Sequence, residues 1–344
     1  MNKKNQKRIL LEDKSSNSII LIWPDISMSK NYSVDAKNLY LEIMNFYTES
    51  RMNVFLICKD LENIENDMSK NEILFKKIKY YECICNDIWV RDFSPIQVNT
   101  EITNEIELLT LNFNGYGNKY EFDCDARFSD FIIECHELSK GQVNDPLFED
   151  KIFFEGGNLI YDSEICFINL SSVKKHNNQI HLDVKKLSEQ FSEKIYQKLL
   201  LIDLPGINGD DTDGHIDNFL RIYKNNILFM GSDSNLHPDY SLLKELERQL
   251  ILSLKKMNKP YNLIKVNHSM DDIVYNENNI LPFSYLNYIE VQGNFLIPTP
   301  KNPYVSDSLI LTDIFKNENI KLLNPLPILK EFGGFHCCSH NWYI

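Results

Sequence analysis

The sequence has no apolar run long enough to cross a membrane. Near its basic N-terminus, the apolar stretch Ile9-Leu10-Leu11 is too short for the hydrophobic region of a secretory signal. The eight cysteines are scattered irregularly, and a chain of 344 residues does not need disulfides in order to fold. These absences predict a protein of the reducing cytoplasm.

Positive charge is also scarce. The chain has 36 Lys and Arg against 49 Asp and Glu, a formal net charge of −13. Such a surface repels nucleic acid and anionic lipid and attracts cations. We therefore expect no nucleic-acid partner and no membrane partner. Acidity also serves solubility, so charge alone does not identify a ligand.

No Pro-, Gly- or Ser-rich linker divides the chain, and no sequence motif repeats at a fixed period. Short apolar runs of strand length alternate with segments of helical period, which predicts a single-domain α/β fold in which a strand–helix unit recurs about five times. The expected strands are Ile19–Trp23, Val54–Cys58, Ile106–Phe113, Ile165–Leu170, Leu199–Leu204, Asn226–Met230, Tyr288–Ile297 and Lys321–Asn324. The expected helices are Ser33–Arg51, Asp125–Lys140, Asp183–Lys198, Tyr240–Lys256 and Ser306–Asn317.

The first segment with chemical potential is NDIWVRD, residues 86–92. Trp89 offers an aromatic face and Asp92 a charged acceptor, which together suit a cation. The alternative is an ordinary strand end at which Asp92 pairs with Arg91.

The second segment is FFEGGN, residues 153–158. Two glycines after an acid let the backbone turn sharply and bring Glu155 close to other main chain. A purely structural turn explains the same pattern.

The third segment, DTDGHIDN, covers residues 211–218 and precedes the strand-like Phe219–Ile222. In an extended chain, His215 and Asp217 would face the same side, one to move protons and the other to hold a cation. Zinc ligation and a structural pair remain alternatives.

The fourth segment is GGFHCCSH, residues 333–340. Two glycines leading to a cysteine beside histidines are typical of an exposed nucleophile on a tight turn, although chemistry alone does not choose between Cys337 and Cys338. The rival is a metal cluster of Cys337, Cys338, His336 and His340, with or without Cys83 and Cys85. Adjacent cysteines point apart, which disfavours it.

Together, the four segments supply a cysteine, a histidine, a carboxylate to orient the histidine and two further carboxylates. A guanidinium is planar and permanently charged, and carboxylates that accept paired hydrogen bonds hold it best. Two buried carboxylates without a cation would be costly. The set therefore predicts a hydrolase whose cysteine thiolate attacks the guanidinium carbon of an arginine-like small molecule.

The four segments, in this order, resemble the agmatine deiminase family and its relatives, the bacterial-type peptidylarginine deiminases. The pieces that carry the resemblance are NDIWVRD, FEGGN, DDTDGHIDN and GGFHC, with weaker likeness at LIWPD, FNGYGNKY and LPFSYLNYI. The resemblance spans nearly the whole chain. It implies the pentein fold, a single-domain α/β propeller of five ββαβ-type units around a pseudo-fivefold axis. Residues 1–16 would be a partly flexible N-terminal segment, and residues 17–344 the catalytic domain.

By motif, the resemblance implies that Cys337 is the nucleophile and His215 the general acid and base, oriented by Glu155. Asp92 and Asp217 would hold the guanidinium. The other implied substrate-binding residues are Trp89, which would line the pocket, Asp87 and Gly334. The family's chemistry implies no metal and no cofactor.

The expected reaction is hydrolysis of agmatine to N-carbamoylputrescine and ammonia through a covalent thiouronium. Deimination of free or peptidyl arginine, or amidino transfer with the same residues, remains an alternative. A zinc hydrolase and a non-enzymatic cation-binding protein are more remote ones. The expected partner is a small cationic guanidino compound, and a homo-oligomer is left open because family members commonly self-associate.

The sequence departs from the family pattern in two places. The family usually continues His-Cys-Ile-Thr-Gln-Gln, whereas this chain has His336-Cys337-Cys338-Ser339-His340-Asn341. Near the N-terminus, Glu12-Asp13 and Ser15-Ser16 stand where the family tends to carry a Glu-Trp…His stretch. These differences leave the identity of the substrate tail open.

Overall fold

The structure is a computed structural model. It describes residues 7–12, 16–25, 32–68, 76–100, 106–135, 137–138, 142–148, 152–178, 181–255, 257, 260–300 and 309–344.

Five sheets in the described residues repeat one strand order, in which a central strand has an antiparallel neighbour on one side and a parallel neighbour on the other. Their strands, in spatial order, are β19 (Ser339–Trp342), β2 (Ser18–Ile22), β3 (Asn53–Cys58) and β4 (Lys79–Glu82); β1 (Lys7–Ile9), β5 (Ile96–Thr100), β6 (Ile106–Thr110) and β7 (Gln142–Pro146); β8 (Ile160–Tyr161), β9 (Ile165–Asn169) and β10 (Lys198–Ile202); β11 (Leu220–Tyr223), β12 (Asn226–Gly231) and β13 (Asn262–Asn267); and β16 (Ile289–Val291), β17 (Asn294–Pro298) and β18 (Asn319–Leu323). A short hairpin joins β14 (Tyr275–Asn276) to β15 (Asn279–Ile280).

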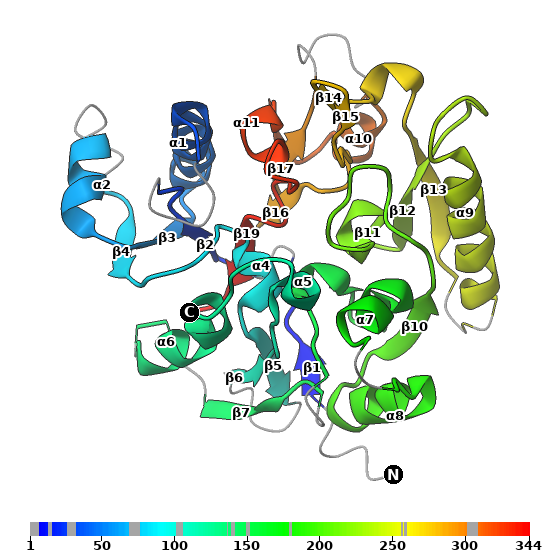
Figure 1. The fold of residues 1–344 in the computed structure, drawn as a ribbon, viewed down its shortest axis with the longest axis horizontal. Helices are drawn as coiled ribbons and strands as arrows, with labels where there is room; N and C mark the ends of the chain where they lie inside the picture. The colour runs from blue at the N-terminus through cyan, green and yellow to red at the C-terminus, as the bar shows by residue number, and fades with distance from the viewer. Residues whose placement is uncertain are drawn as a thin grey trace.

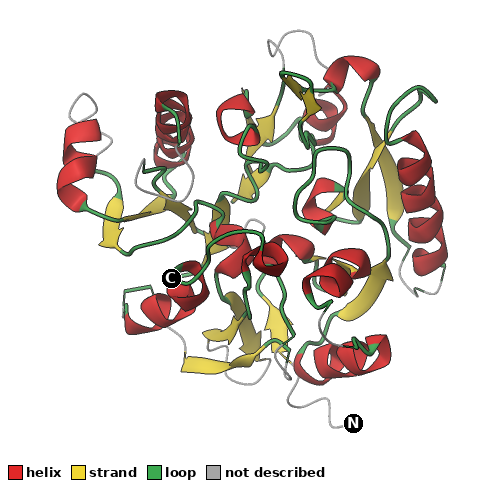
Figure 2. Ribbon diagram, viewed as in Figure 1, coloured by secondary structure: helices red, strands yellow, loops and turns green. Residues whose placement is uncertain are grey.

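The sheets follow one another in chain order around the middle of the molecule, and the longer helices lie toward its outside (Figures 1 and 2). The α-helices are α1 (Val34–Glu49), α2 (Leu61–Met68), α4 (Val90–Phe93), α5 (Gly115–Asn118), α6 (Phe128–Glu134), α7 (Leu170–His176), α8 (Val184–Lys194), α9 (Tyr240–Leu254), α10 (Leu309–Ile314) and α11 (Leu326–Leu329). Short 3₁₀ turns are η3 (Asp125–Arg127), η4 (Gly156–Asn158), η5 (Ile216–Asn218) and η6 (Met270–Asp272). The predicted α/β class is confirmed.

The sheet that contains β2 is completed by the far end of the chain. β19 pairs antiparallel with β2, and Ser339 lies opposite Leu21. β2 is buried along its whole length because sheet neighbours and helices cover it. The pairing brings the GGFHC segment, which directly precedes β19, to the centre of the fold.

Helix α1 shows why the sequence predicts its helices well. Ser33 caps its N-terminus by accepting a hydrogen bond from the Ala36 amide at 3.2 Å. Its buried residues recur at helical spacing, and they are Ala36, Leu39, Tyr40, Ile43, Met44, Phe46 and Tyr47. The predicted range Ser33–Arg51 is therefore nearly that of the helix.

Other predicted elements differ from the structure. Tyr288–Ile297 is not one strand but the hairpin of β16 and β17, because Gln292 and Gly293 both adopt positive φ and reverse the chain. The predicted helices Asp125–Lys140 and Asp183–Lys198 are shorter, and they end at Glu134 and Lys194. Part of the predicted helix Ser306–Asn317 lies outside the described residues.

Candidate active site

Three short turns from distant parts of the sequence meet at the centre of the fold. They are α4, which carries Asp92, η4, which follows Glu155, and η5, which carries Asp217. A Cβ on Gly156 would lie 2.1 Å from the Arg91 carbonyl oxygen, so only glycine permits this approach of η4 to α4. The Glu-Gly-Gly pattern therefore places Glu155 beside the Asp92 segment.

Asp92 is buried and held from two sides. Its carboxylate accepts hydrogen bonds from the Tyr116 hydroxyl and the Gly157 amide, both at 2.8 Å, and its Oδ1 lies 3.5 Å from Nδ1 of His215. Burial raises the pKa of Asp92 to about 6, with a further raising contribution from Asp217 and an opposing one from His215. Asp92 does not pair with Arg91, whose guanidinium binds Glu12 instead.

His215 and Asp217 reach the site from a 3₁₀ turn. The extended conformation expected for this segment is wrong, because Ile216–Asn218 form η5. A Cβ on Gly157 would nevertheless lie 2.7 Å from Nδ1 of His215 and 3.4 Å from Oδ2 of Asp217. Both side chains thus converge beside η4.

Glu155 lies next to His215 but makes its hydrogen bond elsewhere. Its Oε2 lies 3.9 Å from Nε2 of His215, and 2.8 Å from Nδ1 of His176, at the end of α7. All three side chains are buried. The sequence pointed to the contact with His215 and missed His176.

The Cys337 thiol faces Asp217 and Asn287. Its Sγ lies 3.6 Å from Oδ2 of Asp217 and accepts a hydrogen bond from Nδ2 of Asn287 at 3.3 Å. Burial raises the pKa of Cys337 well above its ordinary value, and Asp217 and then Asp92 raise it further. The neighbouring Cys338 points away and donates to the Phe335 carbonyl at 3.3 Å.

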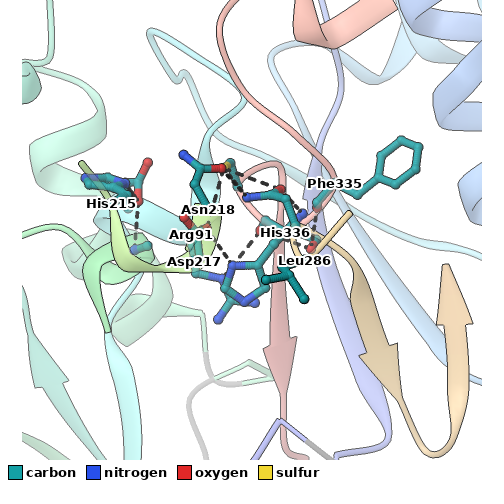
Figure 3. A network of polar contacts seen from close by, with 12 residues as sticks. Arg91, His215, Asp217, Asn218, Leu286, Phe335 and His336 are labelled. Carbon is teal, nitrogen blue, oxygen red and sulfur yellow. Dashed lines mark hydrogen bonds and ion pairs between the residues drawn. The ribbon is translucent and has the colours of Figure 1, made fainter. Parts of the chain in front are cut away.

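His336 links Asp217 to the N-terminal segment. One ring nitrogen lies 2.7 Å from Oδ2 of Asp217 and the other 2.9 Å from Oε2 of Glu12. Figure 3 shows His336 beside Asp217. Glu12 also binds the buried guanidinium groups of Arg91 and Arg221. His336 therefore holds Asp217 through one of its two carboxylate oxygens. Glu12 belongs to this network, although the sequence around it departs from the family pattern.

Several buried polar atoms at this centre have no hydrogen-bond partner among the described residues. They are Oδ1 of Asp217, Oε1 of Glu155 and both ring nitrogens of His215. Buried polar groups are normally paired, and an orphan costs about 1–3 kcal/mol. The unpaired acceptors of two carboxylates beside a thiol suit a ligand that donates several hydrogen bonds and carries positive charge.

The remaining predicted residues surround this centre. A Cβ on Gly333 would lie 2.4 Å from the Trp89 ring, and one on Gly334 would lie 2.4 Å from Oδ1 of Asn287. These glycines let the loop before Cys337 pack closely on Trp89 and Asn287. Asp87 is buried and accepts a hydrogen bond from the Tyr32 hydroxyl.

Sequence reasoning missed the roles of several contacting residues. Tyr116 and Asn287 belong to FNGYGNKY and LPFSYLNYI, so their motifs did contain the signal. His176 and Arg221 lie in stretches with no motif, and only the fold brings them to the site.

The best-defined cavity in the described structure does not contain the thiol. It has a volume of about 370 Å³, and its wall includes Glu12, Tyr161, Arg221 and Glu290. None of the predicted catalytic side chains lines it. The candidate site is therefore defined by its contacts and not by this cavity.

Within the described ranges, no group of three or more His, Cys, Asp or Glu side chains is arranged to hold a metal ion. The helices described here include none with the length and apolarity to cross a membrane.

Comparison with known proteins gives consistent relatives. Residues 8–342 match the model of the Porphyromonas-type peptidyl-arginine deiminase family. The agmatine deiminase of Pseudomonas aeruginosa (strain LESB58) is 23% identical, over 76% of this chain and 76% of that protein. The solved agmatine deiminase of Enterococcus faecalis superposes with a TM-score of 0.79 at 18% identity, covering 99% of this chain and 96% of that one. That of C. jejuni gives 0.77 at 20% identity, covering 98% and 97%.

Proposed function

The chain belongs to the Porphyromonas-type peptidyl-arginine deiminase family, whose members hydrolyse C–N bonds in amidines, and from this membership we propose that it deiminates agmatine. The products would be N-carbamoylputrescine and ammonia. We further propose that Cys337, His215, Glu155, Asp92 and Asp217 carry the reaction.

The observation that carries this proposal is the set of buried carboxylates around one thiol. Asp92 and Asp217 both lie beside η4, and Cys337 Sγ is 3.6 Å from Asp217. Oδ1 of Asp217 has no partner in the described structure. A guanidinium placed between these buried acids would pair with them and compensate their charge.

The substrate itself would ionise the nucleophile. In the free protein, burial and the two aspartates keep the Cys337 pKa high, so its thiol stays protonated. A bound guanidinium offsets the negative charge of the two aspartates and so favours the thiolate form of Cys337. The thiol proton passes to neutral His215, and the sulfur attacks the guanidinium carbon.

The imidazolium of His215 then returns this proton to the departing nitrogen, which leaves as ammonia. The remaining thiouronium is attacked by water, from which the now neutral His215 removes a proton. The C–S bond breaks, and the sulfur leaves as the thiol after taking up that proton. The second proton of the water carries the positive charge away from the ureido product and converts the released ammonia to ammonium. Atoms and charge balance without a metal or cofactor.

Acidic groups beyond the guanidinium site favour an ammonium tail. Tyr116 bonds Asp92 through its hydroxyl, and its pKa is raised by burial first, then by Asp92, Asp87 and Asp211. Tyr120 packs on Tyr116 and donates to Asp211 at 2.7 Å. Asp87 and Asp211 therefore lie, like Asp92, close enough to Tyr116 to interact with it electrostatically. Lys119 and Lys175 are nearby cations, and both are held by Asp213. Agmatine ends in an ammonium, whereas arginine carries a carboxylate that these acids would repel.

The test is an assay of ammonia release with agmatine, arginine and a peptidyl arginine. We expect turnover of agmatine, with a ureido product. A new guanidino compound would instead indicate amidino transfer to an amine, and turnover of arginine alone would overturn the substrate assignment.

Substitution of the nucleophile tests the residue assignment. Cys337→Ser should lose ammonia release and still bind agmatine. Cys338→Ser is the matched control, because this adjacent buried thiol faces Phe335, and it should retain turnover. Activity in the first variant, or its specific loss in the second, would contradict the assignment.

The wider proposals follow the family. We assign residues 17–344 to the catalytic domain, with the five repeating sheets as the units of a pentein propeller and Glu12 contributed by segment 1–16. We place the reaction in the cytoplasm, where guanidino metabolites are available. A homo-oligomer is tested by measuring the molar mass in solution.

A further inference from the structure

Glu155 is shared between two buried histidines. Its Oε2 lies 2.8 Å from Nδ1 of His176 and 3.9 Å from Nε2 of His215, and the two imidazole centroids are 6.4 Å apart. The proposed function gives roles to His215 and Glu155 but none to His176. His176 is thus a buried titratable group that touches the acid–base machinery without a role in it.

His176 is held in place from several elements. Its carbonyl accepts a hydrogen bond from Nδ2 of Asn114, which caps α5, and α5 lies against α7 (Figure 1). Gly117, at a φ of 77°, passes close to the ring, since a Cβ there would lie 3.5 Å from its Cδ2. The Tyr116 ring is 6.4 Å from it. The imidazole cannot easily turn away from Glu155.

The far side of His176 is also acidic. Nε2 lies 3.5 Å from Oδ2 of Asp213, which in turn binds Lys119 and Lys175. Although burial opposes charging, Glu155 and Asp213 raise the pKa of His176 to about 9. At neutral pH, an imidazolium therefore stands between two carboxylates, and it compensates the charge of Glu155.

His215 faces a different set of groups. Nδ1 lies 3.5 Å from Asp92, Nε2 faces Glu155, and the Tyr116 ring is 6.0 Å away. Asp210 and Asp217 also interact with it electrostatically. Carboxylates therefore face both ring nitrogens of His215, so a change in the charge beside Glu155 acts directly on this imidazole.

We propose that His176 is a positioning residue for the deiminase reaction: through its hydrogen bond to Glu155, it fixes that carboxylate opposite His215 and offsets its charge, and so sets the pH range in which His215 exchanges its proton. The kinetic part of this proposal rests on the proposed function. The electrostatic part concerns the free protein and stands without it.

Loss of the His176 charge leaves Glu155 uncompensated. The imidazolium of His215 is then stabilised, and the pKa of His215 rises. At a separation of about 6 Å in a partly polar interior, the shift is roughly one to two pH units. The acidic limb of the kcat/KM profile, where His215 loses its proton and becomes the base, moves up by the same amount, and kcat at neutral pH falls because the neutral base is scarcer.

The experiment compares His176→Gln with the wild-type protein. Gln keeps a donor for Glu155 but no charge. The His215 resonance, assigned with His215→Asn, is followed by NMR titration in the absence of substrate, and agmatine turnover is measured across pH. His181→Gln is the control, because His181 is an exposed histidine of the same region.

A second variant covers the case in which His176→Gln does not fold. Asp213→Asn weakens the charge on His176 from its outer side, and Asn tolerates the φ of 61° at this position. It should move the His215 titration in the same direction by a smaller amount.

An upward shift of the His215 titration in these variants, and not in His181→Gln, supports the proposal. An unchanged His215 titration, or a shift downward, overturns it whether or not agmatine is turned over. Absence of turnover by the wild-type protein with a shifted His215 titration would instead refute the proposed function alone.

Discussion

At Asp92, folding and cation binding make opposite demands. The folded protein raises the pKa of this carboxyl to about 6, above its unfolded value of about 3.9. The protonated form therefore stabilises the fold below about pH 4, and this stability is lost as the pH rises through 6. At neutral pH the buried Asp92 carboxylate is therefore ionised at a cost in free energy, and a bound cation would reduce that cost.

Asp92→Asn should therefore separate stability from activity. We expect kcat/KM for agmatine to fall about a thousandfold, since a charged partner of the guanidinium is lost. The free energy of unfolding at pH 7 should rise by on the order of 2 kcal/mol, and this gain should vanish near pH 4. Urea unfolding at both pH values measures it.

The exposed Asp123 supplies the control for this variant. Asp123→Asn should leave both quantities unchanged. If Asp92→Asn were less stable than the wild type at pH 7, the carboxylate would be contributing to the fold, and the argument from its raised pKa would be wrong.

At the scale of elements, the candidate site consists of short turns whose geometry the sequence pattern does not predict. The alternation of His215 and Asp217 suggested a strand, yet η5 is a 3₁₀ turn that brings both to η4. Similarly, β16 and β17 read as one apolar run because the reversal uses Gln292, which is not a usual turn residue. Longer elements such as α1 were predictable, since periodicity and capping are local.

Replacing the two adjacent glycines of η4 with alanine should have different effects on stability and activity. Gly157→Ala would place a methyl group 2.6 Å from Oδ1 of Asp92 and 2.7 Å from Nδ1 of His215. Side chains can shift, so we expect a folded protein that has lost activity by about 10²-fold or more. Kinetics with thermal unfolding measures both effects.

Gly156→Ala is the matched comparison. Its methyl group would meet the main-chain carbonyl of Arg91 at 2.1 Å, so the loss should appear in stability as well. Equal loss of stability in the two variants would show that Gly157 serves packing and not the site.

At the scale of the molecule, the sequence indicated the four segments that meet in the candidate site, but not the long-range contacts that connect them. The four motifs contain the acids, the histidine and the thiol that the fold brings together, because such residue types cluster in recognisable local patterns. The buried link from Glu12 through His336 to Asp217 depends on contacts across 324 positions of the chain, and no local pattern encodes it. The same holds for the pairing of β19 with β2.

Glu12 should consequently be a stability determinant of the whole fold. Although burial opposes its ionisation, Arg91 and His336 hold the pKa of Glu12 well below its usual range. Its contribution is present above about pH 4.3 and is lost as the pH falls through the folded pKa. Glu12→Gln leaves two buried arginines without their anion, so we expect a loss of about 3–5 kcal/mol at pH 7.

Denaturant unfolding at pH 7 measures this loss, and Glu189→Gln provides the control. Glu189 is an exposed carboxylate 3.7 Å from Lys185 on α8, a pairing worth little in water. A stable Glu12→Gln variant would mean that the arginines find other partners, and that the N-terminal segment is not needed to hold Asp217.

The pairing of β19 with β2 also bears on biosynthesis. β2 is translated long before β19, its antiparallel neighbour in the sheet. Until β19 is made, the edge of β2 that it will cover is open, and an open strand edge is prone to mispairing. Cys337 lies two residues before the start of β19, so the strand that closes this sheet and the thiol are synthesised together.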